Sequence, residues 1–93
     1  MPTVRQQIFE LLSVGWWDSR QLADYFGLQE AEVTAHLHHI AQSATSRGMR
    51  LEIRPSGCRQ CGFRFRHRQR LDRPGRCPRC RSERIDPPAF TLK

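Results

Sequence analysis

Apolar residues in the first half of the chain recur at the spacing of amphipathic helices. The pattern predicts helices over residues 4–14, from about 18 to 26, and 30–45. Thr3 is expected to cap the first helix, and Asp18 or Ser19 the second, because short polar side chains accept hydrogen bonds from the free amides of a first turn. The residues expected to face inward are Val4, Ile8, Leu11, Leu12, Leu22, Ala23, Phe26, Val33, Leu37, Ile40 and Ala41.

Strict alternation replaces the helical period after the third helix. Apolar and charged residues alternate over 49–54, which is typical of a half-buried strand, and Pro55 ends the run. A second alternating segment, 89–93, is the only remaining partner, so we expect the two to pair antiparallel. The sequence therefore predicts an α+β fold, in which a module of residues 56–87 is inserted into a domain made of residues 1–55 and that last strand.

The junction between the second and third helices has the spacing of a helix-turn-helix. Ala23 is small where two helices must approach closely, and Gly27 follows four residues later at the turn. Val33 and Leu37 then anchor the third helix. In such a motif the later helix enters the major groove of DNA. A plain three-helix core with a short turn gives the same pattern and remains an alternative.

All four cysteines fall into two identical short pairs, Cys58-x2-Cys61 and Cys77-x2-Cys80. This spacing is typical of a structural zinc site, because four thiolates fill the tetrahedral positions of one ion. Disulfides are the alternative, but they predict a secreted chain, and nothing at the N-terminus resembles a signal peptide. Spacing alone does not choose zinc over iron. A catalytic zinc is not expected, since no coordination position stays open.

The residue after each pair differs. Gly62 follows the first pair and tolerates a positive φ, whereas Arg81 follows the second, where a glycine would be expected. The chain has 93 residues of which 38% are hydrophobic, which is little for a large core. A metal that holds a small module together fits that shortage.

Charge divides the chain into two unlike halves. The formal net charge is +7 and the pI about 10.6, which suggests a polyanionic partner such as nucleic acid. Residues 1–46 hold two Arg and five Asp or Glu, whereas residues 47–93 hold fourteen Lys or Arg and four Asp or Glu. The positive charge is therefore concentrated in and around the cysteine module.

Arginines alternate with other residues between the two cysteine pairs. If residues 63–70 form a strand, Phe63, Phe65 and His67 share one face and the arginines share the other. A row of guanidinium groups suits phosphates, because each offers a planar fork for two hydrogen bonds. A solvated surface in an arginine-rich protein is the alternative. The candidate phosphate contacts are Arg64, Arg66, Arg68 and Arg70.

The third helix is a weaker candidate for nucleic-acid contact. Its first turn carries Glu30 and Glu32, which repel phosphate. Thr34, His38 and Gln42 are the side chains expected to reach bases in the major groove. The same helix could instead face a protein.

The chain as a whole resembles a small prokaryotic family of predicted transcriptional regulators. The resemblance rests on the segments RQQIFELL, QLADYFGL, EVTAHLHHIAQS, CRQCGF and CPRC. It implies a winged helix-turn-helix fused to a four-cysteine zinc ribbon with rubredoxin-like knuckles. It also implies DNA binding and transcription regulation.

We therefore expect a DNA-binding transcriptional regulator whose partner is double-stranded DNA. A homodimer is compatible with two-fold operators. The alternative is a protein-interaction adaptor of the transcription or RNA machinery that docks through its acidic helical half, and an iron-containing electron carrier is a third hypothesis. No enzyme is expected, since no nucleophile, base and oxyanion site come together, and no small-molecule substrate is evident. No apolar run reaches the ~20 residues of a membrane helix, so a cytoplasmic protein without membrane contact is expected.

Overall fold

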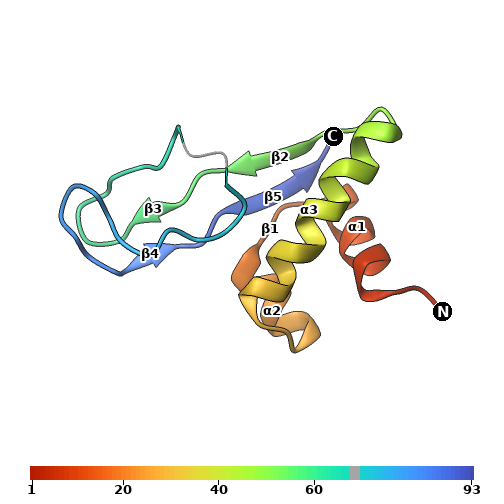
Figure 1. Cartoon of the computed structure of the whole chain (residues 1–93), viewed down its shortest axis with the longest axis horizontal. Helices are drawn as coiled ribbons and strands as arrows, with labels where there is room; N and C mark the ends of the chain where they lie inside the picture. The colour runs from red at the N-terminus through yellow and green to blue at the C-terminus, as the bar shows by residue number, and fades with distance from the viewer. Residues whose placement is uncertain (68–69) are drawn as a thin grey trace.

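A computed structural model describes residues 1–67 and 70–93 and has an α+β fold. Three helices lie at one end of the molecule and two small antiparallel sheets extend from them toward the other end (Figure 1). The elements in chain order are α1 (Val4–Val14), β1 (Trp17–Asp18), α2 (Ser19–Phe26), α3 (Glu30–Ser46), β2 (Leu51–Arg54), β3 (Gly57–Cys58), β4 (Ile85–Asp86) and β5 (Ala89–Leu92).

Helices α1 and α2 begin where capping chemistry predicts. Thr3 accepts a hydrogen bond from the Gln6 amide at 3.1 Å, and the Gln6 side chain accepts one from the Thr3 amide at 2.9 Å. Asp18, rather than Ser19, makes the same reciprocal pair with Gln21. Each capping box satisfies two amides that a helix start leaves without partners. Both predicted helix starts are confirmed.

The turn after α2 and the end of α3 also follow the sequence closely. Gly27 has a φ of 67°, the left-handed conformation that glycine adopts without a Cβ clash. Helix α3 ends at Ser46, one residue beyond the predicted end. Its buried face holds Val33, Leu37 and Ile40 as predicted, whereas Ala41 is only half-buried.

The three-stranded sheet has the order β1-β5-β2, and its middle strand is the last one in the sequence. Leu51 pairs with Leu92 and Arg54 with Ala89, so the antiparallel pairing expected for these two segments is confirmed. The strand predicted for residues 49–54 begins two residues later in the structure, at Leu51. The two-residue strand β1, which pairs with β5, was not predicted.

The second sheet continues the first toward the cysteines. Gly57 pairs with Asp86 and Cys58 with Ile85. The chain therefore runs outward through β2 and β3, turns through both cysteine pairs, and returns through β4 and β5 (Figure 1). The cysteine module is an insertion between two strands that pair with each other.

The main core lies between the helices and one face of the three-stranded sheet. Its fully buried side chains include Ile8, Leu12, Leu37 and Phe90, and burial of apolar surface of this kind is the main stabilising contribution to folding. Within the described residues, no helix combines the length and apolar composition needed to cross a bilayer.

Candidate metal centre and basic surface

Two matching turns carry the cysteines. In the first, the Gly62 amide donates to the Cys58 carbonyl at 2.9 Å, and in the second the Arg81 amide donates to the Cys77 carbonyl at 2.9 Å. Both residues have positive φ, 80° for Gly62 and 64° for Arg81. The two knuckles thus have the same backbone geometry, although only one carries the glycine that this geometry favours.

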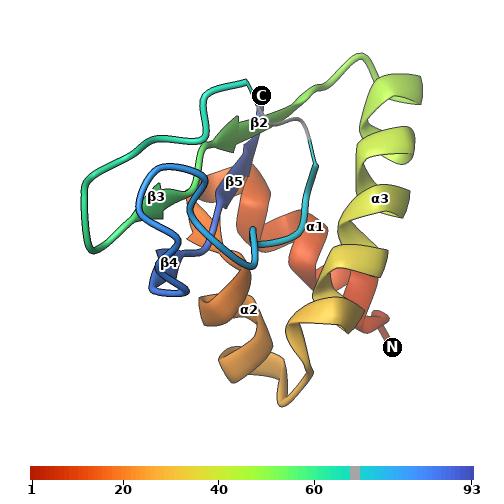
Figure 2. The same cartoon turned by 60° about the vertical axis from the view of Figure 1, so that its left-hand side comes forward.

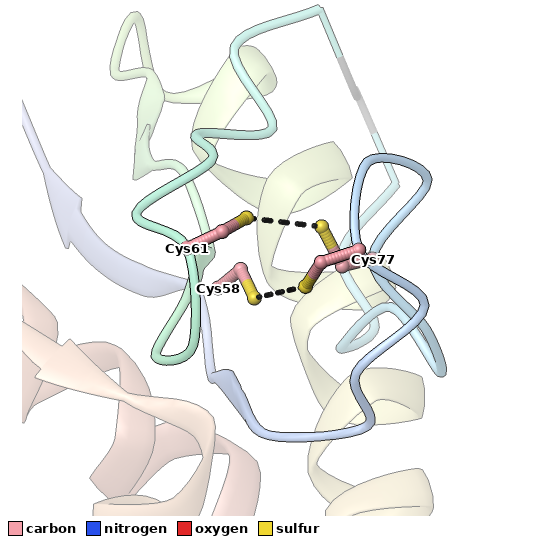
Figure 3. Close-up of side chains that lie close together, drawn as sticks. Cys58, Cys61 and Cys77 are labelled. Atoms are coloured by element: carbon pink, nitrogen blue, oxygen red, sulfur yellow. Dashed lines mark hydrogen bonds between the residues drawn. The ribbon is translucent and has the colours of Figure 1, made fainter.

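The four sulfur atoms converge from the two knuckles (Figure 3). Cys58 Sγ lies 3.5 Å from Cys80 Sγ, and Cys61 Sγ lies 3.6 Å from Cys77 Sγ. All four lie within 4.8 Å of one another and none is in a disulfide. Tetrahedral zinc with Zn–S bonds of about 2.3 Å requires sulfur atoms roughly 3.8 Å apart. The donor set fits one four-coordinate zinc.

Backbone amides prepare two of the thiols for metal binding. Desolvation raises the pKa of Cys58, but hydrogen bonds from the amides of Cys61 and Gln60 outweigh it and lower the pKa to about 7. Desolvation also opposes ionisation of Cys77, and the amides of Cys80 and Arg79 again lower its pKa. Thiolates, not thiols, bind zinc, so these amides favour the ligand form.

The Cys80 thiol shows why the site needs a cation. The Ser82 amide favours the Cys80 thiolate, but desolvation and the three neighbouring sulfur atoms raise its pKa to about 12. Four thiolates this close repel one another strongly. A divalent ion at their centre removes that repulsion, so the cluster reaches its fully ionised form only with a metal.

The cysteine module has only a small apolar core of its own. A small second core consists of Cys58, Cys77 and Ile85, against which Phe63 and Phe65 pack. The two phenyl rings meet edge to face with centroids 5.1 Å apart. So small a core does not supply enough folding free energy, and a structural metal supplies the remainder.

A short β ladder with two cysteine knuckles that share one metal defines a zinc ribbon, here combined with a three-helix N-terminal part. The chain belongs to the PF0610-like family: the model described as "PF0610-like, N-terminal" matches residues 3–51, and that of the "PF0610 rubredoxin-like zinc beta-ribbon domain" matches residues 55–93. The site therefore holds one structural zinc.

A solved structure has the same architecture. The solution NMR structure of protein PF0610 from Pyrococcus furiosus is 37% identical in sequence and superposes with a TM-score of 0.80. The alignment covers 97% of this chain and 88% of that chain. Comparison with curated proteins gave no match.

In its described part, the arginine run between the knuckles does not form the strand considered for residues 63–70. Within its described part, Arg64 makes one isolated bridge to Gly57, and Arg66 and His67 lie in a turn. Phe63 and Phe65 still share the apolar side, as predicted. A strand needs a ladder partner, and within residues 63–67 and 70 the run pairs only with Gly57, through Arg64.

The predicted phosphate contacts differ in their surroundings. Arg64 and Arg66 are exposed and have no acidic partner among the described residues, whereas Arg70 forms an ion pair with Asp72 at 3.1 Å. Arg68 lies outside the described residues. The candidates on α3 lie along one side of the helix at four-residue spacing: His38 and Gln42 are exposed, and half-buried Thr34 donates its hydroxyl to the Glu30 carbonyl at 3.0 Å.

The loop between the knuckles packs against α3. The sequence did not predict this contact. Leu71 is 7% exposed and belongs to the main core. Figure 2 shows the segment that follows residues 68–69 running close to the helices before the chain reaches β4. Arg73 forms an ion pair with Glu30 of α3, and its Nη1 donates to the Ile85 carbonyl at 3.1 Å. A 320 Å³ cleft between Arg70–Asp72 and α3 is lined by Thr34 and His38. The sequence signal was Leu71 itself, the only aliphatic residue between Phe65 and Cys77 apart from Pro74.

Proposed function

We propose that this protein is a DNA-binding transcriptional regulator, built as a winged helix-turn-helix whose wing, β2 and β5, carries the zinc ribbon. The observation that supports the proposal best is the state of the ribbon's arginines. Exposed guanidinium groups without acidic partners are free to bind phosphates, and such contacts supply most of the affinity for duplex DNA.

Ion pairing divides the ribbon's arginines into two sets. Nearby carboxylates neutralise one set: Arg59 pairs with Asp86, Arg70 with Asp72, Arg73 with Glu30 and Arg76 with Glu83. The other set is exposed and has no acidic partner among residues 1–67 and 70–93. These residues, here called the free arginines, are Arg64, Arg66, Arg79, Arg81 and Arg84.

The proposed role of α3 follows from the position of the ribbon loop. The loop Arg70–Asp72 flanks the first half of the helix, and the Thr34 hydroxyl is already bonded within the helix. His38 and Gln42 lie further along the same side and are exposed. We therefore expect the later part of α3 to approach the major groove while the free arginines bind the backbone.

A salt series with matched variants tests this function. The zinc-loaded protein is titrated into a labelled random-sequence duplex at several salt concentrations, and the bound fraction is sequenced. Steep salt dependence is expected, with a slope of about −0.9 in log K per phosphate contact, together with an enriched sequence. Arg64→Gln with Arg66→Gln should weaken binding and reduce the slope by about two contacts.

The matched control removes the same number of charges from paired arginines. Arg59→Gln with Arg76→Gln should reduce the slope less, because Asp86 and Glu83 already neutralise these groups. Equal reductions of the salt slope in both double variants would mean that duplex affinity depends only on the net charge of the protein. Absence of salt-dependent binding would overturn the DNA-binding proposal.

One observation favours the adaptor as a second candidate. Val14 is 85% exposed and Tyr25 is 63% exposed, and with Leu11 and Phe26 they line a 370 Å³ depression between α1 and α2. Exposed apolar surface of this kind is common at protein interfaces. If the protein does not bind duplex DNA, a protein partner that docks on Tyr25 and Val14 should be sought. Tyr25→Glu is the variant expected to abolish binding of that partner.

A further inference from the structure

The three-stranded sheet has an outer face that carries an exposed tryptophan. Strand alternation turns Leu51, Ile53, Phe90 and Leu92 toward the main core, so their neighbours in each strand face outward. Thr91 Oγ1 on that outer side lies 2.8 Å from the Gly15 carbonyl. This contact fixes the turn after α1 against the outer face, and the next residue, Trp16, remains 38% exposed there.

Two cations, one at the end of β2 and one directly after β5, lie over the Trp16 ring. Arg54 Cζ is 4.3 Å from the ring centroid and Lys93 Nζ is 6.0 Å from it. Both distances are those of cation–π contacts. A guanidinium held over an indole keeps its N–H edge available for phosphate oxygens.

Neither cation over Trp16 is neutralised by an acid. Within residues 1–67 and 70–93, Arg54 and Lys93 form no ion pair, whereas Arg50 on the same face is paired with Glu52 at 2.6 Å. The outer face thus combines a partly exposed aromatic ring with two unneutralised positive charges that lie over it. This is the chemistry of a site that stacks a base and binds the phosphates beside it.

We propose that Trp16, Arg54 and Lys93 form a binding site for single-stranded nucleic acid. One unpaired base takes the place of the Arg54 guanidinium over the indole, and Arg54 and Lys93 then contact the flanking phosphates. A duplex cannot use this site in the same way, because its bases are already stacked on one another. The site lies on the outer face of the three-stranded sheet and does not depend on duplex binding by the free arginines.

Fluorescence of Trp16 tests the site directly. The chain has two tryptophans, so Trp17→Phe leaves Trp16 as the sole tryptophan reporter. Trp17 is half-buried and packs against the core, where phenylalanine keeps an aromatic ring. Titration with a single-stranded oligothymidylate is expected to quench Trp16 strongly. Inorganic polyphosphate, which has the charge but no bases, should quench it little, and a duplex of the same length should bind this site more weakly.

Affinity measurements separate stacking from charge. With a labelled single strand and the zinc-loaded protein, Trp16→Leu should weaken binding roughly ten- to a hundredfold, whereas Trp16→Phe should keep most of the affinity. Arg54→Gln should also weaken binding, and Arg20→Gln, which removes a charge from α2, should have little effect.

Three results would overturn the proposal: equal quenching by polyphosphate, full affinity in a folded Trp16→Leu variant, or a Trp16 response to duplex equal to that for single strand. None of them bears on the duplex proposal, because that proposal is tested through Arg64 and Arg66 in a protein with both tryptophans intact.

Discussion

Gly62 and Arg81 occupy equivalent positions in the two cysteine knuckles, with φ values of 80° and 64°. Each donates its amide to the carbonyl of the first cysteine of its pair. An L-residue in this conformation brings its Cβ close to the following carbonyl, at a cost of roughly 1–2 kcal/mol that glycine avoids. The second knuckle is therefore strained where the first is not.

Arg81→Gly should stabilise the ribbon by about 0.5–1 kcal/mol. The gain is smaller than the strain itself, because glycine also increases the conformational entropy of the unfolded chain. The measurement is the free energy of unfolding of the zinc-loaded protein in denaturant. Gly62→Ala is the opposite control and should lower the free energy of unfolding by about 1 kcal/mol. No atom outside the neighbouring residues lies within 4 Å of the added Cβ, so this loss would come from the positive φ alone.

Cys58→Ser should abolish tight zinc binding and unfold the ribbon while α1, α2 and most of α3 stay helical. The helical core is buried mainly by residues outside the ribbon, but closing an unstructured loop of about thirty residues between β2 and β5 costs roughly 3 kcal/mol. Metal analysis, far-UV circular dichroism and thermal unfolding measure the three effects. Complete loss of helicity would show that ribbon and helices fold as one unit.

The ion pair between Arg73 and Glu30 should couple the ribbon to α3. Both side chains are about one-third exposed, at 31% and 34%, so solvent weakens the interaction. A double-mutant cycle with Arg73→Met and Glu30→Gln should give a coupling of about 1 kcal/mol. Arg70→Met with the same Glu30→Gln is the matched control, since Arg70 pairs with Asp72, and that cycle should show no coupling.

His36 should make the protein less stable in mild acid. Desolvation and the adjacent Arg5 lower the pKa of His36 below its usual 6.5, and His39 lowers it further. Glu32 raises this pKa, but by less than the other groups lower it. Arg5 Nε donates to His36 Nδ1 at 3.3 Å, which requires the neutral imidazole. The folded protein thus binds this proton more weakly than the unfolded chain, and stability falls as the pH drops from about 6.5 through the folded pKa.

Denaturant midpoints measured from about pH 7.5 to about pH 5 would show this His36 contribution. His36→Gln should flatten the pH dependence in that window. An unchanged profile in the variant would mean that His36 is not the source of the pH dependence.

Local chemistry made much of this fold predictable. The polar caps Thr3 and Asp18, the left-handed Gly27 and the two cysteine pairs each act within a few residues, so sequence spacing alone locates the helices and the metal ligands. The pairing of β2 with β5 was predictable because only one segment could supply the missing partner.

The structural features that were not predicted from the sequence depend on contacts between residues far apart in the chain. Leu71 is one apolar residue in a charged loop, and nothing near it in the chain shows that it enters the core beside α3. The alternation of residues 63–70 suggested a strand, but a strand needs a partner, and only Gly57 pairs with this run in its described part. The ion pair between Arg73 and Glu30 joins residues that are 43 positions apart.

The position of β5 in the sequence has a consequence for how the protein is made. Because β5 is the middle strand of its sheet yet follows the ribbon, the helices emerge from the ribosome before the strand that joins β1 to β2 exists. Zinc binding by the four cysteines would bring β4 beside β3, and β5, which follows β4 in the chain, pairs with β2. The metal therefore makes it easier for the earliest and latest segments of the chain to meet, and we expect nascent chains starved of zinc to expose for longer the apolar face that Phe90 covers.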